Sequence, residues 1–471
     1  MSQVVAADET AASRRRARSA LAVIVAAQLL VVLDACVVNI ALPAAQADLR
    51  MADSGRQWVV TGYSLTFGGL LLLGGRVADV LGRKKTFLAG LCGFTVASVV
   101  GGVATTEATL LVARGAQGVA AAFLAPAGLA ILTTIFPDGR ERARAFAIFG
   151  AATGSGGVVG MILGGVLTSY GSWRWCLLIN LPLGLLVLAV ALRYLEESTA
   201  ARPARFDLAG VVTATLGAGS LIYGISNVAA GGWLDPATMG PTAAGVALLV
   251  AFVLIERRSA EPMMPLHVVA DRVRGSAFLV ILLVNAATLA FYLLLTFYLQ
   301  VVKDYSAMAT GLAFVPIGIG ILVGATVAGR ALSRWQPRQV TIAGLLVAVT
   351  GMAAMSLLRV DTPFWALVMP AQLVVGAGVG ATLTTIVSLA LVGVPPHESG
   401  VASALTNAMG QIGGAAGVSV LNMIAVVVTT AEGASPTTGY ATAFLGGAIL
   451  LALALLTALL GARPARRSRV N

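Results

Sequence analysis

The chain has 471 residues, of which 58% are hydrophobic and only 11% are charged. Soluble globular domains carry about 25% charged residues, so this composition excludes an ordinary soluble protein. The mean hydropathy of +0.91 and the 54 glycines are typical of closely packed membrane helices. The net charge of +11 lies in short gaps between apolar segments, as membrane topology requires. We therefore expect no nucleic-acid partner.

Cysteine and histidine usage limits the chemistry further. The cysteines fall in or beside apolar segments and the histidines lie far apart in polar stretches: Cys36, Cys92, Cys176, His267 and His397. This pattern predicts neither a disulfide framework nor a metal site. The sequence also has no phosphate-binding loop of the Gly-x-x-x-x-Gly-Lys type, so we expect no ATP-driven step within this chain.

Fourteen segments have the length and apolar character of membrane spans. A transmembrane helix needs about 20 mostly apolar residues, and the first segment is too long for a cleavable signal. The predicted spans are 20–42, 58–76, 86–104, 109–135, 145–169, 173–193, 207–227, 240–256, 275–302, 309–330, 339–358, 364–392, 400–430 and 440–461.

Basic residues support this count, because cytoplasmic loops carry an excess of Lys and Arg. With the N-terminus in the cytoplasm, most of the 31 lysines and arginines fall in cytoplasmic gaps or tails. The exceptions are Arg50, Arg56, Arg174, Lys303 and Arg359 in outer loops, and Arg114 within a span. The bias predicts an even number of spans and two cytoplasmic termini.

The gap after the second span carries the most distinctive pattern, with Gly75, Asp79, Gly82 and Arg83 at fixed spacing. Glycine permits a tight turn, and Asp79 can pair with Arg83 to hold two helices in one arrangement. The positive-inside rule explains the basic residues but neither Asp79 nor the glycines. A shorter Gly-Arg copy at 329–334 follows the tenth span and indicates repeated halves, as in many secondary transporters.

This loop resembles the signature loop of the major facilitator superfamily, which also follows the second span. Four further segments resemble motifs of its fourteen-span drug:proton antiporters, in order and at matching spacing. They are 33–43 in the first span, 110–118 in the fourth, 172–184 between the fifth and sixth, and 399–407 in the thirteenth. Together these motifs cover most of the chain.

The resemblance implies an all-α integral membrane protein with the major-facilitator fold. The expected domains are a cytoplasmic tail (1–19), an N-terminal six-helix bundle (20–193), two inserted spans with flanking loops (194–274), a C-terminal six-helix bundle (275–461) and a basic tail (462–471). A monomer in the inner, or plasma, membrane is implied. Abundant arginine, alanine and glycine suggest a bacterial origin.

The fifth span carries a glycine pattern that resembles the family's antiporter motif. Its members are Gly156, Gly160, Gly164 and Gly165, with Met161 where the motif has proline. Glycines spaced four residues apart share one helix face and allow close packing. The pattern therefore indicates either the antiporter motif or a plain packing face.

Asp34 and Arg114 are charged residues within predicted spans. Such charges are costly in a membrane and usually mark an ion or substrate pathway. Asp34 can bind and release a proton, whereas Arg114 stays charged. The resemblance places Arg114 at the family's proton-coupling position and Asp34 at its first-span acid. Alternatively, the two residues form a purely structural ion pair, or their side chains extend to the membrane–water interface.

Polar side chains along two other spans suggest a substrate pathway. They recur every three or four residues and therefore share a helix face, which must avoid lipid. With two residues near the charged pair, the candidate set is Asn39, Gln117, Asn285, Tyr292, Thr296, Gln300, Asn407 and Gln411. These side chains either line a cavity or bond neighbouring helices.

The function that the resemblance implies is export of small, amphipathic, drug-like compounds in exchange for protons. Such an antibiotic or multidrug exporter needs no cofactor and uses the proton motive force, with alternating access between two halves. An alternative on the same fold is proton-coupled uptake of a sugar or metabolite. A sensor or membrane-embedded enzyme is disfavoured, because no polar segment is long enough for a soluble domain and no catalytic cluster is present.

Overall fold

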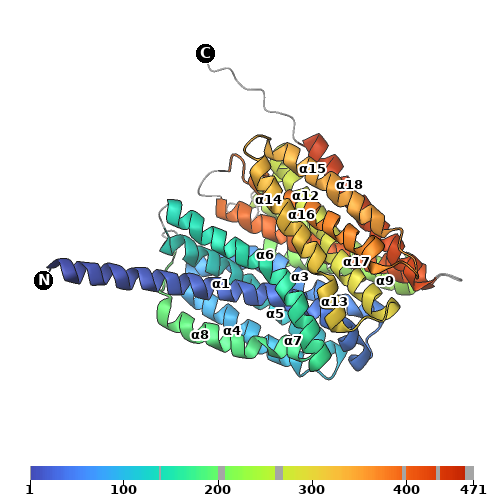
Figure 1. Cartoon of the computed structure of the whole chain (residues 1–471), viewed down its shortest axis with the longest axis horizontal. Coiled ribbons are helices and arrows are strands. Elements are labelled where there is room, and N and C mark those ends of the chain that lie inside the picture. The colour runs from blue at the N-terminus through green and yellow to red at the C-terminus, as the bar shows by residue number, and fades with distance from the viewer. Residues whose placement is uncertain are drawn as a thin grey trace, which may run out of the picture. The chain divides into compact units, whose positions relative to one another are not determined.

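A computed structural model describes residues 2–136, 139–199, 207–259, 269–394, 399–430 and 435–461. Every regular element in these ranges is a helix (Figure 1). Fourteen of the helices are long and apolar enough to cross a membrane, which confirms the predicted all-α membrane fold. Each overlaps one predicted span, although the first helix runs beyond its predicted span of 20–42 at both ends, over Ser2–Leu49.

Contacts divide the chain into two units. Unit 1 comprises 1–218 and 299–314, and unit 2 comprises 219–298 and 315–471. These units do not test the predicted domain boundaries, which stay a prediction.

Unit 1 contains the first six long helices. Its helices are α1 (Ser2–Leu49), α2 (Asp53–Arg56), α3 (Trp58–Leu81), α4 (Arg83–Gly102), α5 (Glu107–Ile135), α6 (Gly139–Tyr170), α7 (Trp175–Leu178), α8 (Asn180–Tyr194), the start of α9 (Leu208–Gly231) and α13 (Ala307–Ala313). Helix α5 packs against both α3 and α4, while α1 packs along α6. Helices α1 and α5 therefore meet within one bundle, where they hold the charged residues that the sequence singles out.

Unit 2 contains the remaining long helices. These are the rest of α9, α10 (Pro236–Arg258), α12 (Arg272–Phe297), α14 (Val315–Ala331), α15 (Pro337–Met355), α16 (Met369–Ala390), α17 (Ser399–Thr430) and α18 (Pro436–Gly461). The π-helical turn η2 (Phe364–Val368) precedes α16, and η1 (Tyr298–Val302) follows α12 and belongs to unit 1 from Leu299 onward. Helix α16 packs between α14 and α15, and α12 packs against α17 and α18.

Two predicted spans are interrupted near a proline. The tenth consists of α13 and α14, with Phe314 between them and Pro316 in the first turn of α14. The sixth consists of α7 and α8, with Ile179 between them and Pro182 in the first turn of α8. Proline has no N–H to donate to the preceding turn, so a continuous helix loses a bond there.

Candidate functional site

The two charged residues predicted within spans meet inside unit 1. A nitrogen of Arg114 (Nη1) on α5 lies 2.5 Å from Oδ2 of Asp34 on α1. Both side chains are buried, with exposed fractions of 1% and 0%. Removing two charges from water costs several kcal/mol per ion, which close pairing and added hydrogen bonds offset.

Arg114 is held by more than this ion pair. Its Nε donates to the carbonyl oxygen of Val59 on α3 over 2.9 Å, and its Nη1 also donates to Oε1 of Gln117 over 2.8 Å. The guanidinium lies over the ring of Tyr63, 4.5 Å from the ring centre. The cation is thus fixed by α3 and α5 independently of Asp34.

Asp34 accepts further hydrogen bonds on its other oxygen. The amide nitrogens of Gln117 and Asn180 donate to Oδ1 over 2.9 and 2.7 Å. The same two nitrogens donate to the hydroxyl of Ser98 on α4, over 2.7 and 3.2 Å. The resulting network joins α1, α4, α5 and α8, and Asp34 is its shared acceptor.

This geometry fits an ionised Asp34, because an ionised carboxylate only accepts hydrogen bonds. Protonation of either oxygen would turn one acceptor position into a donor facing Arg114, Gln117 or Asn180. The local arrangement would then have to change, because a buried donor without an acceptor is costly. The cluster therefore has the chemistry of a proton-sensitive switch. In the described part of the chain, no group of histidines, cysteines and acids is placed to hold a metal ion.

Sequence reasoning missed Ser98 and Asn180 as members of this network. Asn180 lies in the junction segment 172–184, and its amide within an apolar stretch was a usable signal. Ser98 offered no such signal, because a serine hydroxyl can bond within its own helix and needs no partner elsewhere. The Ser98 hydroxyl does donate to the carbonyl of Phe94, over 2.7 Å.

The pattern predicted as a gap after the second span is mostly helical, because Gly75 and Asp79 lie in α3, Arg83 begins α4, and Gly82 is the single residue between the two helices. Arg83 donates to Oδ1 of Asp79 over 2.9 and 3.1 Å, as expected, and to the hydroxyl of Thr134 on α5 over 2.6 Å. Gly82 adopts a φ of +112°, a backbone conformation that favours glycine. Gly75 sits in α3 near Pro126 of α5, and the space around it would admit a methyl group.

An acidic residue after α8 adds a contact that the motif did not predict. The carboxylate of Glu197 accepts from the backbone nitrogens of Lys84 and Lys85, over 3.0 and 3.2 Å. These nitrogens belong to the first turn of α4, which has no partner for them within the helix. Ser198 accepts from the nitrogen of Arg83 over 2.9 Å. The segment after α8 is thereby bonded to the start of α4.

The glycines of the fifth span face two neighbours. Gly156, Gly160 and Gly164 lie against α1, where an added Cβ at Gly160 would be 2.9 Å from the Cβ of Cys36. Gly165 lies against α13, and a Cβ there would be 2.7 Å from the carbonyl oxygen of Ala307. Helix α6 runs unbroken through Met161. The glycines therefore form a packing face, and their part in antiport stays a prediction.

The predicted substrate residues are divided between the units. Unit 1 holds Asn39, Gln117 and Gln300, and the amide of Gln300 donates to the carbonyl of Ile40 over 3.0 Å. Gln117 belongs to the buried network. Asn39 is buried, and its side-chain oxygen has no hydrogen-bond partner among the described residues.

The other members lie in unit 2, where several bond to their own helices. Asn285, Thr296 and Asn407 donate to carbonyls one turn earlier. Thr296 is fully buried, Asn407 is exposed, and Tyr292 and Gln411 are partly buried. Asn285 also faces Gly410 of α17. A substrate role for these residues stays a prediction.

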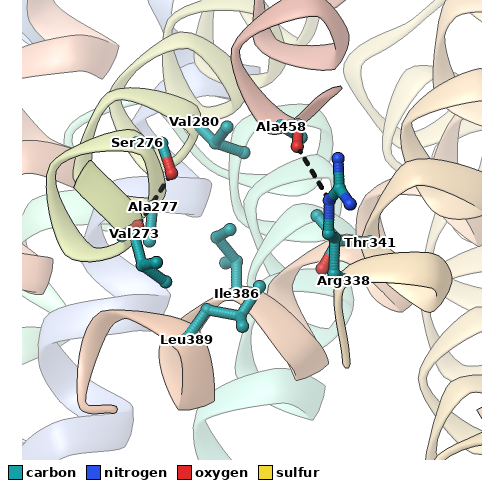
Figure 2. A pocket seen from close by; sticks show the side chains of 9 residues that line it. All are labelled: Val273, Ser276, Ala277, Val280, Arg338, Thr341, Ile386, Leu389 and Ala458. Carbon is teal, nitrogen blue, oxygen red and sulfur yellow. Dashed lines mark hydrogen bonds between the residues drawn. The ribbon is translucent and has the colours of Figure 1, made fainter. Parts of the chain in front are cut away.

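Each unit has a small cavity of its own. The unit 2 cavity has room for about one water molecule. Figure 2 shows it, with Arg338 donating to the carbonyl of Ala458 at its edge. The side chains of Val273, Ala277 and Ile386 line it together with Ser276 and Thr341. No acidic side chain lines this cavity.

The unit 1 cavity is apolar and has room for about one water molecule. Its lining comes from α1, α3 and α5, which hold Asp34, Val59 and Arg114, and from the segment around α7: Val38, Ala41, Leu42, Ala45, Val59, Leu110, Trp173, Cys176 and Leu177.

Comparisons with known proteins agree with this architecture. The puromycin resistance protein pur8 of Streptomyces alboniger is 45% identical over 459 residues, covering 94% of this chain and 91% of that protein. The cephamycin export protein CmcT of Amycolatopsis lactamdurans is 38% identical, covering 98% and 96%. A crystal structure of a bacterial homologue of the human lysosomal transporter Spinster, inward-facing and occupied, shares the fold with a TM-score of 0.66 at 15% identity, covering 94% of this chain and 98% of that one.

The family model described as Major Facilitator Superfamily matches residues 24–418, which include the Asp34–Arg114 network and most of both units. Together with the fourteen candidate spans, this match indicates a multi-pass membrane protein whose task is transport and not enzymatic catalysis. The chain therefore belongs to the Major Facilitator Superfamily.

Proposed function

We propose that this protein is a drug:proton antiporter, which exports small amphipathic, antibiotic-like compounds from a bacterial cell across its inner membrane. The names of the two relatives support the substrate class, since one confers puromycin resistance and the other exports cephamycin. Proton coupling is supported by the buried network around Asp34. The two arguments are independent, because one comes from similarity and the other from geometry.

The observation that carries the proposal is that a buried carboxylate shares its two oxygens among two side-chain amides and a fixed cation. In the ionised form every contact is favourable. In the protonated form the attraction to Arg114 falls and one donor opposes the new O–H. Proton uptake therefore changes the relative stability of two packings of α1, α5 and α8. It acts like a ligand that binds one of two conformations more tightly and shifts the equilibrium toward it.

Arg114 stays positively charged and in place throughout this scheme. It keeps the carbonyl of Val59, the amide oxygen of Gln117 and the ring of Tyr63 when Asp34 is neutral. Asp34 is then the side chain whose charge changes. In an exchange cycle, Asp34 takes up a proton when the transporter is open to the outside and releases it when open to the cytoplasm, while the drug moves in the opposite direction.

The test uses purified full-length protein in proteoliposomes, with efflux of puromycin driven by a pH gradient. Asp34→Asn keeps the shape of the side chain and cannot bind a proton in the same way. We expect it to abolish gradient-driven transport while drug–drug exchange at equal pH continues. Asp53→Asn changes an exposed acid outside the network and serves as the matched control. Retention of gradient-driven efflux by Asp34→Asn would exclude Asp34 from coupling.

The same experiment addresses uptake symport, which the absent proline at Met161 leaves as the second candidate. An antiporter moves drug against the direction of proton flow, whereas a symporter moves its substrate with the protons. Drug accumulation on the side to which the protons flow would show symport, and the proposed function would then be uptake and not export.

A further inference from the structure

We propose that protons reach Asp34 through the interior of unit 1, by way of its apolar cavity, and that Trp173, Asp48 and Arg174 gate the entrance. This inference rests on the proposed proton coupling at Asp34. It assigns the coupling proton a route within one bundle, so that proton and drug need not share a passage.

The cavity lies next to the ionic network, although neither Asp34 nor Arg114 lines it. Val38 follows Asp34 by one helical turn on α1, and Leu110 precedes Arg114 by one turn on α5, so each lies on the same helix face as its charged neighbour. Val59, the third lining residue at this level, accepts the hydrogen bond from Arg114 with its carbonyl oxygen. The cavity thus borders the pair on three helices.

The roof of the cavity is a polar cluster near the ends of α1 and α4. The indole nitrogen of Trp173 donates to Oδ2 of Asp48 over 3.0 Å, and Arg174 lies 2.5 Å from the same oxygen. Arg174 also donates to the carbonyl of Ala104 over 2.9 Å and lies over the Trp173 ring. Trp173 is 5% exposed and lines the cavity, whereas the Asp48 side chain is 47% exposed. A solvent-accessible carboxylate is therefore bonded directly to the ring that closes the cavity.

This roof lies on the side that the distribution of basic residues predicts to be outside. It contains Arg174, one of the few arginines assigned to outer loops, which bonds Asp48 at the end of α1. Protons driven inward by the proton motive force arrive from that side. The cluster is thus placed at the correct end of the bundle for proton entry.

The apolar lining suits a gate better than a permanent channel. An apolar cavity of this kind stays dry, and hydrophobic constrictions control conduction by excluding water. A dry cavity blocks leakage while the roof is closed, and transient wetting after the roof opens allows a proton to pass. Closure by Trp173 would then separate Asp34 from bulk solvent between cycles.

Buried polar atoms near the pair provide an independent reason for water to enter. Among the described residues, the side-chain oxygens of Asn39, Thr61 and Tyr63 are buried and have no hydrogen-bond partner. Tyr63 lies one helical turn after lining residue Val59, with its ring against the Arg114 guanidinium, whereas Asn39 and Thr61 are one and two positions from lining residues and face other sides of their helices. Buried polar groups without a partner are uncommon and are usually served by water. Water beside Tyr63 would satisfy its hydroxyl and extend toward the ion pair.

Several other titratable groups lie near Asp34. They are Cys36 on α1, Tyr63 on α3, Arg114 on α5 and Cys176 on α7. Asp34 is the carboxylate in this set, and the pathway delivers its proton there.

The first experiment narrows the cavity by Ala41→Leu in full-length protein reconstituted with puromycin. Ala41 is 3% exposed and lines the cavity from α1. We expect proton-driven efflux to fall by about tenfold, which corresponds to a barrier increase of about 1.4 kcal/mol. Drug–drug exchange at equal pH should stay within about twofold, since it needs no proton uptake. Ala277→Leu narrows the unit 2 cavity in the same way and is the matched control (Figure 2).

The second experiment opens the roof and uses a cysteine already in the cavity lining. In a background with Cys36→Ala and Cys92→Ser, Cys176 is the remaining thiol. We expect Trp173→Ala to accelerate its modification by the small neutral reagent methyl methanethiosulfonate added from outside, and to cause a drug-independent proton leak. Asp34→Asn should stop the leak. Trp173→Phe keeps a ring and loses the N–H, so it should have a smaller effect. It is the control for misfolding in Trp173→Ala.

The outcomes separate this inference from the proposed function. Proton-driven efflux that is lost in Asp34→Asn but unchanged in Ala41→Leu, with Cys176 equally reactive in all variants, would overturn the internal route and leave coupling at Asp34 in place. Absence of proton-driven transport in the unmodified protein would overturn the proposed function itself. Loss of both efflux and exchange in Ala41→Leu would indicate a general structural defect and would also count against the route.

Discussion

Asn180 donates a hydrogen bond of 2.7 Å to Oδ1 of Asp34, although 146 positions separate them in the chain. The bond ties the start of α8 to the middle of α1 at the charge on which coupling is proposed to depend. It also places Asn180 beside Ser98, so that the carboxylate is bounded by helices on several sides.

Asn180→Ala removes one of the donors that stabilise the ionised carboxylate. A hydrogen bond to a charged group contributes about 1.5–3 kcal/mol, so we expect the pH profile of puromycin efflux to shift toward higher pH. Ser98→Ala removes a neighbour that does not bond Asp34 and should shift the profile less. Initial efflux rates in proteoliposomes between acidic and alkaline pH measure both variants. Identical profiles for Asn180→Ala and the unmodified protein would show that this bond has no influence on coupling.

Arg114→Lys keeps the positive charge but loses the planar group that reaches Asp34, Gln117 and Val59 together. Lysine does not replace arginine where several donors act at once. We expect loss of most proton-driven efflux, although the protein still folds. Arg114→Gln leaves Asp34 buried without its cation and should destabilise the protein by about 3–5 kcal/mol. The double variant Asp34→Asn with Arg114→Gln should recover part of that stability. Thermal unfolding in detergent measures these differences, and purely additive losses would contradict a direct pairing.

The sequence predicted the two charged residues and the spans because both have local signals. A charge in an apolar segment is visible without a structure, as is a run of about 20 apolar residues. Asn180 and Ser98 are different, because their importance lies in which oxygen they reach, and that depends on how α4 and α8 pack around α1. The breaks at Phe314 and Ile179 had a local signal in Pro316 and Pro182, but the broad hydropathy of these spans concealed it.

The cavity and its roof had no signal of this kind. In the sequence, Asp48 and Arg174 look like an unrelated loop acid and loop base, because 126 positions separate them. The same limit applies to Glu197, whose contact with the start of α4 depends on where the segment after α8 runs. Long-range pairs of common residue types leave no periodic pattern along the chain, so only the structure reveals them.

A matched pair of glycines on α6 tests the packing face of the fifth span. A Cβ at Gly160 would be 2.9 Å from Cys36 Cβ and 3.1 Å from the carbonyl of Leu33, whereas a Cβ at Gly154 would have no neighbour within 4 Å. We expect Gly160→Val to force α1 and α6 apart and to cost about 1–3 kcal/mol, as overpacking does. Gly154→Val should be close to neutral. Detergent unfolding temperatures provide the comparison, and equal effects at the two positions would argue against this helix contact.

The turn between α3 and α4 allows backbone strain to be separated from side-chain crowding. Gly82 has a φ of +112°, and an added Cβ would lie 2.6 Å from an oxygen of Glu197. That carboxylate is the end of a flexible side chain and can move, whereas the backbone angle cannot relax without displacing α4. Gly82→Ala should therefore destabilise the protein by about 1–3 kcal/mol through strain. The loss should persist when Glu197→Ala removes the crowded oxygen.

Glu197→Ala alone should cost about 1 kcal/mol, because two backbone nitrogens at the start of α4 lose their acceptor. Gly75→Ala is the control for added volume, since its Cβ would meet Pro126 at an ordinary contact distance of 3.7 Å. The measurement compares the unfolding temperatures of Gly82→Ala, Glu197→Ala, their double variant and Gly75→Ala. If Glu197→Ala instead restored full stability to Gly82→Ala, crowding and not the backbone angle would be the reason for glycine at this turn. Persistence of the loss would show that the turn itself requires glycine, whichever residue caps α4.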